Sequence, residues 1–281
     1  MRRLISGALA AAIVFIASGA RAEVVATGTF RVLRKRERTQ ICRAEWEVND
    51  DGTQTIFTER GQGACHGFTE PVSWESQTRV LSTDSRQLRE TTRWIYSPDG
   101  LTPLKIIRRT FDPDTGTVNA AVVEPFDQGR MVERSWHGIE EVATPTSLLF
   151  VVRDSLARRE RSGSVHVVTS EPSLYTMRWV VRGIEQLTVP AGTFTSVKVE
   201  LLIDLGLLSV LRPLLPKLYV WYVAAPPFQW IKYEGLEDGI GSPKVVIERT
   251  SPLEEPAAAW KGPRGGQAVD EPEPDSAPSR S

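Results

Sequence analysis

Turn-forming residues separate a succession of short β-type segments, and this alternation limits the fold more than any other feature of the sequence. The runs 39–48 and 53–60 flank Asn49-Asp50-Asp51-Gly52, and the runs 104–111 and 118–123 flank Asp112-Pro113-Asp114-Thr115-Gly116. Asp-Gly and Pro-Asp sequences of this kind favour tight reversals between neighbouring strands. Closely spaced hairpins indicate an antiparallel sheet rather than alternating strands and helices.

The rest of the chain follows the same pattern, with one exception. Further strands are expected at 23–33, 88–96, 130–136, 164–169, 174–182, 186–189, 193–203, 219–224, 228–234 and 244–249. The exception is a helix over 144–161, because Thr144-Pro145 is a typical helix start and leucines and valines at 148, 149, 152 and 156 share one face. The sequence therefore predicts a mainly β fold, an antiparallel curved sheet or open half-barrel covered by one or two short helices.

The two ends differ in composition from the middle. Residues 1–22 begin with Arg2 and Arg3, continue as a short apolar run and end in Ala20-Arg21-Ala22. This is the pattern of a signal peptide, so we expect cleavage after Ala22 and a periplasmic protein. Residues 251–281 are rich in proline and acidic residues, which predicts a disordered tail. A single β-rich domain is therefore expected at 23–250.

Charge and cysteine content narrow the function classes. The net charge is −1, and loss of residues 1–22 removes three arginines and no acidic residue, which gives no electrostatic case for nucleic-acid binding. The two cysteines, Cys42 and Cys65, are expected to form a disulfide in an oxidising compartment. The alternative is a pair of reduced, buried thiols.

The most apolar part of the chain beyond residue 22 lies between residues 201 and 231. Its longest uncharged stretch is too short for a transmembrane helix. One interpretation is a helix or loop that caps the core, and the other is the hydrophobic mouth of a ligand cavity. The candidate ligand-binding residues of the second interpretation are Leu207, Leu208, Leu211, Leu214, Leu215, Tyr219 and Trp221.

The chain resembles a known family over roughly residues 144–249, and the motif that carries the resemblance lies between Gly183 and Glu200. This motif contains Gly183, Glu185, Pro190-Ala191-Gly192-Thr193-Phe194 and Lys198-Val199-Glu200, which predict two strands joined by a tight turn. This pattern resembles the exported bacterial family called domain of unknown function 3108. The resemblance implies a β-rich, half-barrel-like periplasmic domain, akin to the lipoprotein carriers, and it implies no catalytic residues.

Motifs of enzymes and metal sites do not emerge from the sequence. There is no Gly-x-Ser-x-Gly elbow and no glycine-rich phosphate loop. His66, His137 and His166 lack metal-ligand spacing, so no metal and no cofactor is expected. A basic run at 31–38 has two interpretations, a solvated strand end and a patch for anionic groups.

Three functional hypotheses follow. The first is a non-enzymatic periplasmic protein that binds or carries a lipid or other apolar ligand. The second is a structural or protein-interaction component of the cell envelope, with the tail as its docking segment. The third is a hydrolase whose site has no recognisable motif.

Overall fold

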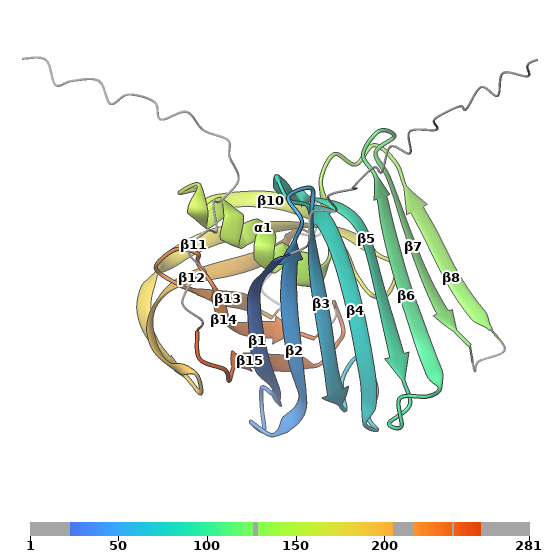
Figure 1. Ribbon diagram of the computed structural model, residues 1–281, viewed down its shortest axis with the longest axis horizontal. Helices are drawn as coiled ribbons and strands as arrows, with labels where there is room; N and C mark the ends of the chain where they lie inside the picture. Colours follow the sequence, from blue (N-terminus) through green and yellow to red (C-terminus); the bar gives the residue numbers. More distant parts are fainter. Residues whose placement is uncertain (1–22, 126–128, 205–215, 238, 254–281) are drawn as a thin grey trace, which may run out of the picture.

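The computed structural model describes residues 23–125, 129–204, 216–237 and 239–253. In these residues fifteen strands form a single sheet, with one helix against it (Figure 1). The predicted mainly β fold is confirmed. The leucines of the segment 207–215 and the expected signal peptide and tail beyond Leu253 lie outside the described residues.

The first half of the chain is a meander of eight antiparallel strands. They are β1 (Glu23–Arg34), β2 (Gln40–Asp50), β3 (Gln54–Gly63), β4 (Val72–Leu81), β5 (Asp84–Tyr96), β6 (Pro103–Asp112), β7 (Thr117–Glu124) and β8 (Arg130–Trp136). Strand β4 is absent from the prediction. Ser76 and Thr78 are buried at its inward positions, so the usual alternation of apolar and polar residues is hidden.

The second half begins with two short elements and continues as another meander. It comprises β9 (Val142–Ala143), α1 (Pro145–Ala157), β10 (Ser162–Val168), β11 (Leu174–Val189), β12 (Gly192–Asp204), β13 (Leu218–Val223), β14 (Trp230–Leu236) and β15 (Lys244–Arg249). The two strands expected at 174–182 and 186–189 are one long strand, β11, whose pairing with β12 shifts register next to Gly183. The predicted turn at Pro190-Ala191 joins β11 to β12.

Two pairings between distant parts of the chain close the sheet. Strand β15 pairs with β1, and the two-residue strand β9 lies parallel to both β5 and β10. Because β5 also pairs with β4, twelve strands form a closed barrel, while β6, β7 and β8 continue from β5 as a wing. The expectation of an open half-barrel is therefore wrong. The expectation was based on local sequence patterns. Such patterns could not show a closure that depends on a two-residue strand and on pairing between the first and last strands.

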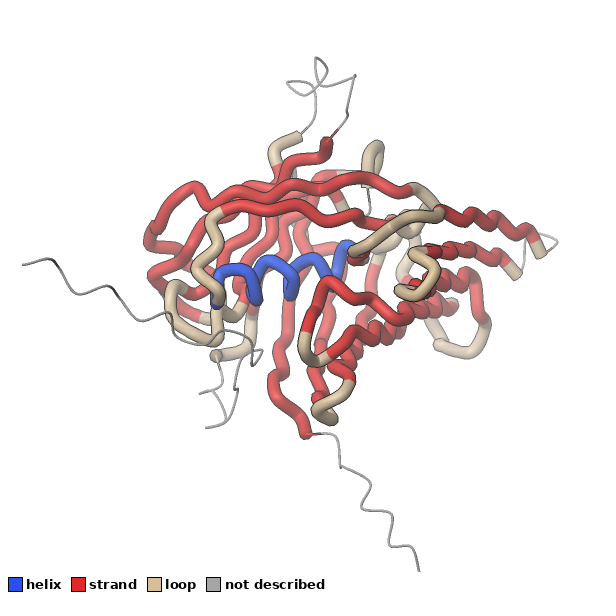
Figure 2. The backbone as a smooth tube through the Cα atoms, turned by 90° about the horizontal axis from the view of Figure 1, so that it is seen from above, coloured by secondary structure: helices blue, strands red, loops and turns tan. Residues whose placement is uncertain are grey.

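Helix α1 covers one end of the barrel (Figure 2). Its cap is the predicted one: the Thr144 hydroxyl accepts from the backbone of Ser147, and the Ser147 side chain accepts from the backbone of Thr144. Leu148, Val151 and Val152 are buried in the core shared with β10–β13, and Phe150 is buried against β3. In the described part of the chain, no helix has the length and apolar character of a membrane span.

Candidate functional site

A cavity of about 200 Å³ lies inside the barrel. Its walls are mostly aromatic and aliphatic and come from both halves of the chain. They include Phe30, Trp46, Phe57, Leu148, Phe150 and Leu218. Concave apolar sites with a few polar groups are the usual form of small-molecule sites.

One wall of the cavity is a continuous series of aromatic rings. Phe30 stacks on Trp230 with a centroid distance of 4.0 Å, and Phe57 stacks on Phe150 at 3.7 Å. Trp46 lies 6.1 Å from both Phe30 and Phe150 and links the two stacks. Strands β14, β1, β2 and β3 and helix α1 are joined in this way, which fixes the apolar part of the cavity.

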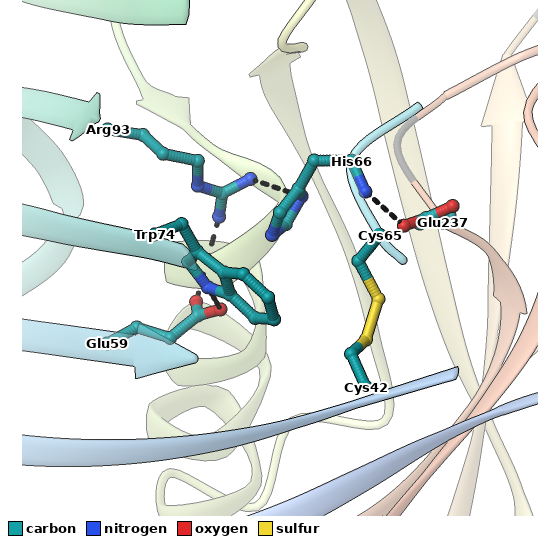
Figure 3. The surroundings of a disulfide bond; sticks show 7 residues. All are labelled: Cys42, Glu59, Cys65, His66, Trp74, Arg93 and Glu237. Atoms are coloured by element: carbon teal, nitrogen blue, oxygen red, sulfur yellow. Dashed lines mark hydrogen bonds and ion pairs between the residues drawn. A yellow bond between two sulfur atoms is a disulfide. The ribbon is translucent and has the colours of Figure 1, made fainter. Parts of the chain in front are cut away.

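A polar cluster of four side chains, Glu59, His66, Trp74 and Arg93, lies beside the Cys42–Cys65 disulfide (Figure 3). His66 is in the turn that follows β3, and the other three residues are on β3, β4 and β5. The Arg93 guanidinium is 3.6 Å from a carboxylate oxygen of Glu59 and 3.3 Å from Nδ1 of His66. Trp74 donates from Nε1 to the other oxygen of Glu59 at 2.9 Å. All four of these residues line the cavity.

Local structure fixes His66 in place. The residue before His66 is Cys65, and the predicted disulfide joins it to Cys42 of β2. His66 has a φ of 59°, and its backbone N–H donates to Glu237 Oε1 at 2.5 Å. Its ring stands edge-on to Trp74, with centroids 4.6 Å apart.

The Trp74 indole in turn lies over Gly61 of the neighbouring strand β3. A Cβ atom at Gly61 would come within 2.1 Å of the indole. Any larger residue at that position would therefore displace Trp74, which forms one side of the polar cluster.

The surroundings of His66 keep its imidazole neutral. Burial lowers its pKa well below 6.5, and the positive charges of Arg93 and Lys105 lower it further. Arg93 can only donate, so Nδ1 of the neutral ring accepts and the ring proton is on Nε2. His66 therefore presents a buried Nε2–H donor.

Three cavity-lining residues carry a buried nitrogen that has no hydrogen-bond partner among the described residues. These nitrogens are Trp46 Nε1, His66 Nε2 and Arg93 Nε. All three are donors. Buried donors without partners are rare in folded proteins because they cost free energy, so their presence in one cavity marks it as a candidate ligand site.

A second buried arginine of the lining has a different environment. Arg109 of β6 is 2% exposed, and it donates from Nε to the carbonyl oxygen of Thr169 at 3.0 Å and from Nη2 to the hydroxyl of Ser170 at 2.9 Å. It thus ties the wing strand β6 to the turn after β10.

The sequence predicts that Tyr219 and Trp221 belong to a ligand mouth. Their ring centroids are 5.8 Å apart, but neither residue lines the cavity. The neighbouring Leu218 does. Lys198 lies over both rings, and Trp221 donates to Glu185 at 2.7 Å. The two aromatic residues therefore belong to a cation–aromatic cluster on the face of β13 opposite Leu218.

Other residues singled out in the sequence are placed as follows. In the basic run, Arg31 and Arg38 pair with Glu248, and Lys35 pairs with Glu234. No group of three or more His, Cys, Asp or Glu side chains that could hold a metal ion occurs in the described part of the chain.

Sequence interpretation missed Glu59 and Arg93, and it placed His66 among ordinary histidines. A signal was present, since Glu59 follows Phe57 and Arg93 precedes Ile95 at positions that alternate with outward-facing residues. A charged residue in phase with core positions of a strand indicates a buried charge.

Comparisons with protein families, curated proteins and solved structures give different results. No family model matches the chain, and no curated protein matches it, so membership of the domain of unknown function 3108 family has no match to support it. Among solved structures, the chain is similar to a beta-barrel-like protein of domain of unknown function DUF1849 from Brucella abortus. The TM-score is 0.48 at 7% identity, over 82% of this chain and 97% of that one.

Proposed function

We propose that this chain is a non-enzymatic periplasmic protein that binds a small, largely apolar ligand inside its barrel. The observation that supports the proposal most strongly is the cavity of about 200 Å³ with aromatic and aliphatic walls. A dry apolar cavity of roughly 150 Å³ already accommodates benzene. The volume therefore suits a ring or a single short acyl chain better than a whole diacyl lipid.

The disulfide between Cys42 and Cys65 supports the periplasmic part of the proposal, because such bonds persist in oxidising compartments. Fractionation of cells that express the full chain, with N-terminal sequencing of the product, tests it. We expect a periplasmic protein that begins at Glu23. A cytoplasmic protein that retains Met1 would contradict the proposal.

The binding proposal is tested with 1-alkanols from butanol to dodecanol, titrated calorimetrically. Each added CH₂ contributes about 0.8 kcal/mol, so affinity rises about fourfold per carbon while the chain still fits. We expect the rise to stop at an intermediate length, when the cavity is full. A rise that continues to dodecanol would indicate adsorption to the surface, and absence of saturable binding would contradict the proposal outright.

A cavity-filling variant locates the binding. Leu218→Phe adds volume inside the cavity, so the rise should stop at a shorter alkanol, and Leu201→Phe serves as a second variant at another lining position. Ile184→Phe is the matched control, because Ile184 is 68% exposed on β11. Equal chain-length limits in the filled variants and the control would place the ligand elsewhere.

Each of the two alternatives predicts a result of its own in a separate assay. Hydrolysis of methyl octanoate by the purified protein would favour the hydrolase. Capture of the protein by envelope components only when residues 254–281 are present would favour the interaction protein; those residues lie outside the described part of the chain.

A further inference from the structure

We propose that the ligand carries a carboxylate at the end that lies beside the disulfide, where His66 Nε2–H donates to it and the Arg93 guanidinium faces it. This inference rests on the proposed function and adds the chemical class of the ligand. Figure 3 shows the imidazole and the guanidinium facing each other, with Trp74 and Glu59 along one side.

The hydrogen-bonding capacity of this end points to an acceptor. Both oxygens of Glu59 have partners, one in Trp74 and one in Arg93. The nitrogens without partners among the described residues, His66 Nε2 and Arg93 Nε, both donate. A ligand with an amine would bring more donors to a site that already has donors in excess, whereas a carboxylate brings acceptors only.

Charge favours an anion over a neutral acceptor. Arg93 is 9% exposed, and among the described residues its cation has one ion-pair partner, Glu59 at 3.6 Å. This distance is longer than that of a close charge-assisted hydrogen bond. Arg93 and Lys105 both act on His66 as positive charges. A carboxylate would therefore gain a charge-assisted interaction that an ester or alcohol of the same length lacks.

The nearby acidic residues favour one negative charge rather than two. Glu59 lies beside Arg93, and Glu237 accepts the backbone N–H of His66. A phosphate monoester would bring up to about two negative charges close to these carboxylates, and like charges at short range repel. A carboxylate brings one.

The test compares octanoate, methyl octanoate and octyl phosphate, titrated at pH 8 against the wild-type chain and Arg93→Met. We expect octanoate to bind the wild type at least about tenfold more tightly than the ester. Arg93→Met should reduce this preference to about threefold or less, because the positive charge is lost while the His66 donor remains. Arg108→Met is the matched control, because Arg108 has a 64% exposed side chain on the next strand and pairs with Glu90.

His66→Asn is a second variant in case Arg93→Met does not fold, since asparagine tolerates a positive φ. It should lower octanoate affinity more than ester affinity. Equal binding of octanoate and ester to the wild type, or tightest binding of octyl phosphate, would overturn the carboxylate while the apolar site stands. Failure of all three probes to bind would overturn the carboxylate and the proposed function together.

Discussion

Arg93 and Arg109 line the same cavity from neighbouring strands, β5 and β6, and both are buried, yet their partners differ. Arg109 donates at 2.9–3.0 Å to Ser170 and Thr169 and joins two parts of the fold. Arg93 has a longer ion pair with Glu59, and its Nε has no partner among the described residues. Because a buried charge needs hydrogen bonds to be tolerated, the difference supports the proposal that Arg93 contacts a ligand, whereas Arg109 joins two parts of the fold.

The largest expected effect is on the structural arginine. Arg109→Met should lower the free energy of unfolding by about 3 kcal/mol, because the Thr169 carbonyl and the Ser170 hydroxyl each lose a donor inside the protein. Arg93→Met should cost less, about 1–2 kcal/mol: Nδ1 of His66 and one Glu59 oxygen lose a donor, but the Glu59 side chain is 21% exposed and its other oxygen keeps its bond to Trp74. Urea unfolding measures both values. Equal losses in the two variants would remove the distinction between the arginines.

Removal of the disulfide tests the ligand side of the comparison. The double variant Cys42→Ala, Cys65→Ala should lose about 3 kcal/mol, because the bond closes a loop across 23 residues of sequence separation. It should also weaken octanoate binding, because His66 directly follows Cys65. Unchanged octanoate affinity, measured by calorimetry under conditions where the variant remains folded, would show that the disulfide does not hold the His66 donor in place.

A smaller effect concerns pH. The pKa of His66 is below 6.5 in the folded protein, so the unfolded chain binds more protons between the folded pKa and 6.5. The contribution of His66 to stability is therefore complete above pH 6.5 and is lost as the pH falls through this range. The groups that surround His66 are Arg93 of β5, Lys105 of β6, Glu59 of β3 and Glu237 after β14.

The measurement is the free energy of unfolding of the wild type and of His66→Asn between pH 8 and pH 5. The wild type should lose more stability than the variant as the pH is lowered. Parallel pH dependences would mean that His66 is not held neutral by its surroundings.

The smallest effect is expected on the outer face of the barrel. Tyr219→Leu removes one ring from below Lys198, and contacts of this kind at partly exposed sites contribute about 0.5–1 kcal/mol. The affinity for octanol should stay within about twofold, because Tyr219 does not line the cavity. A large fall in affinity would instead support the ligand mouth at Tyr219 and Trp221 that the sequence predicts.

Local chemistry explains which parts of the fold were predictable. The turns at 49–52 and 112–116 form as expected, since Asp50 accepts from the backbone of Gly52 and Asp112 accepts from the backbone of Asp114. The cap of α1 is likewise contained within Thr144–Ser147. The closure of the barrel was not predictable, because its pairings join distant strands or depend on two residues at 142–143.

The candidate site was predictable only in its disulfide. Glu59, His66 and Arg93 come from β3, the turn after it and β5, and only the folded barrel brings them together. The leucine-rich segment was chosen as the candidate ligand site because its apolar residues follow one another closely in the sequence. An interior assembled from single residues on many strands gives no comparable run.

The most direct test of the account is a crystal structure of the wild-type chain with 8-bromooctanoate, with bromine located by its anomalous signal. The account predicts bromine inside the barrel against Phe57 and Phe150, with the carboxylate within hydrogen-bond distance of His66 Nε2. Bromine outside the barrel, for example beside Tyr219 and Trp221, would contradict it.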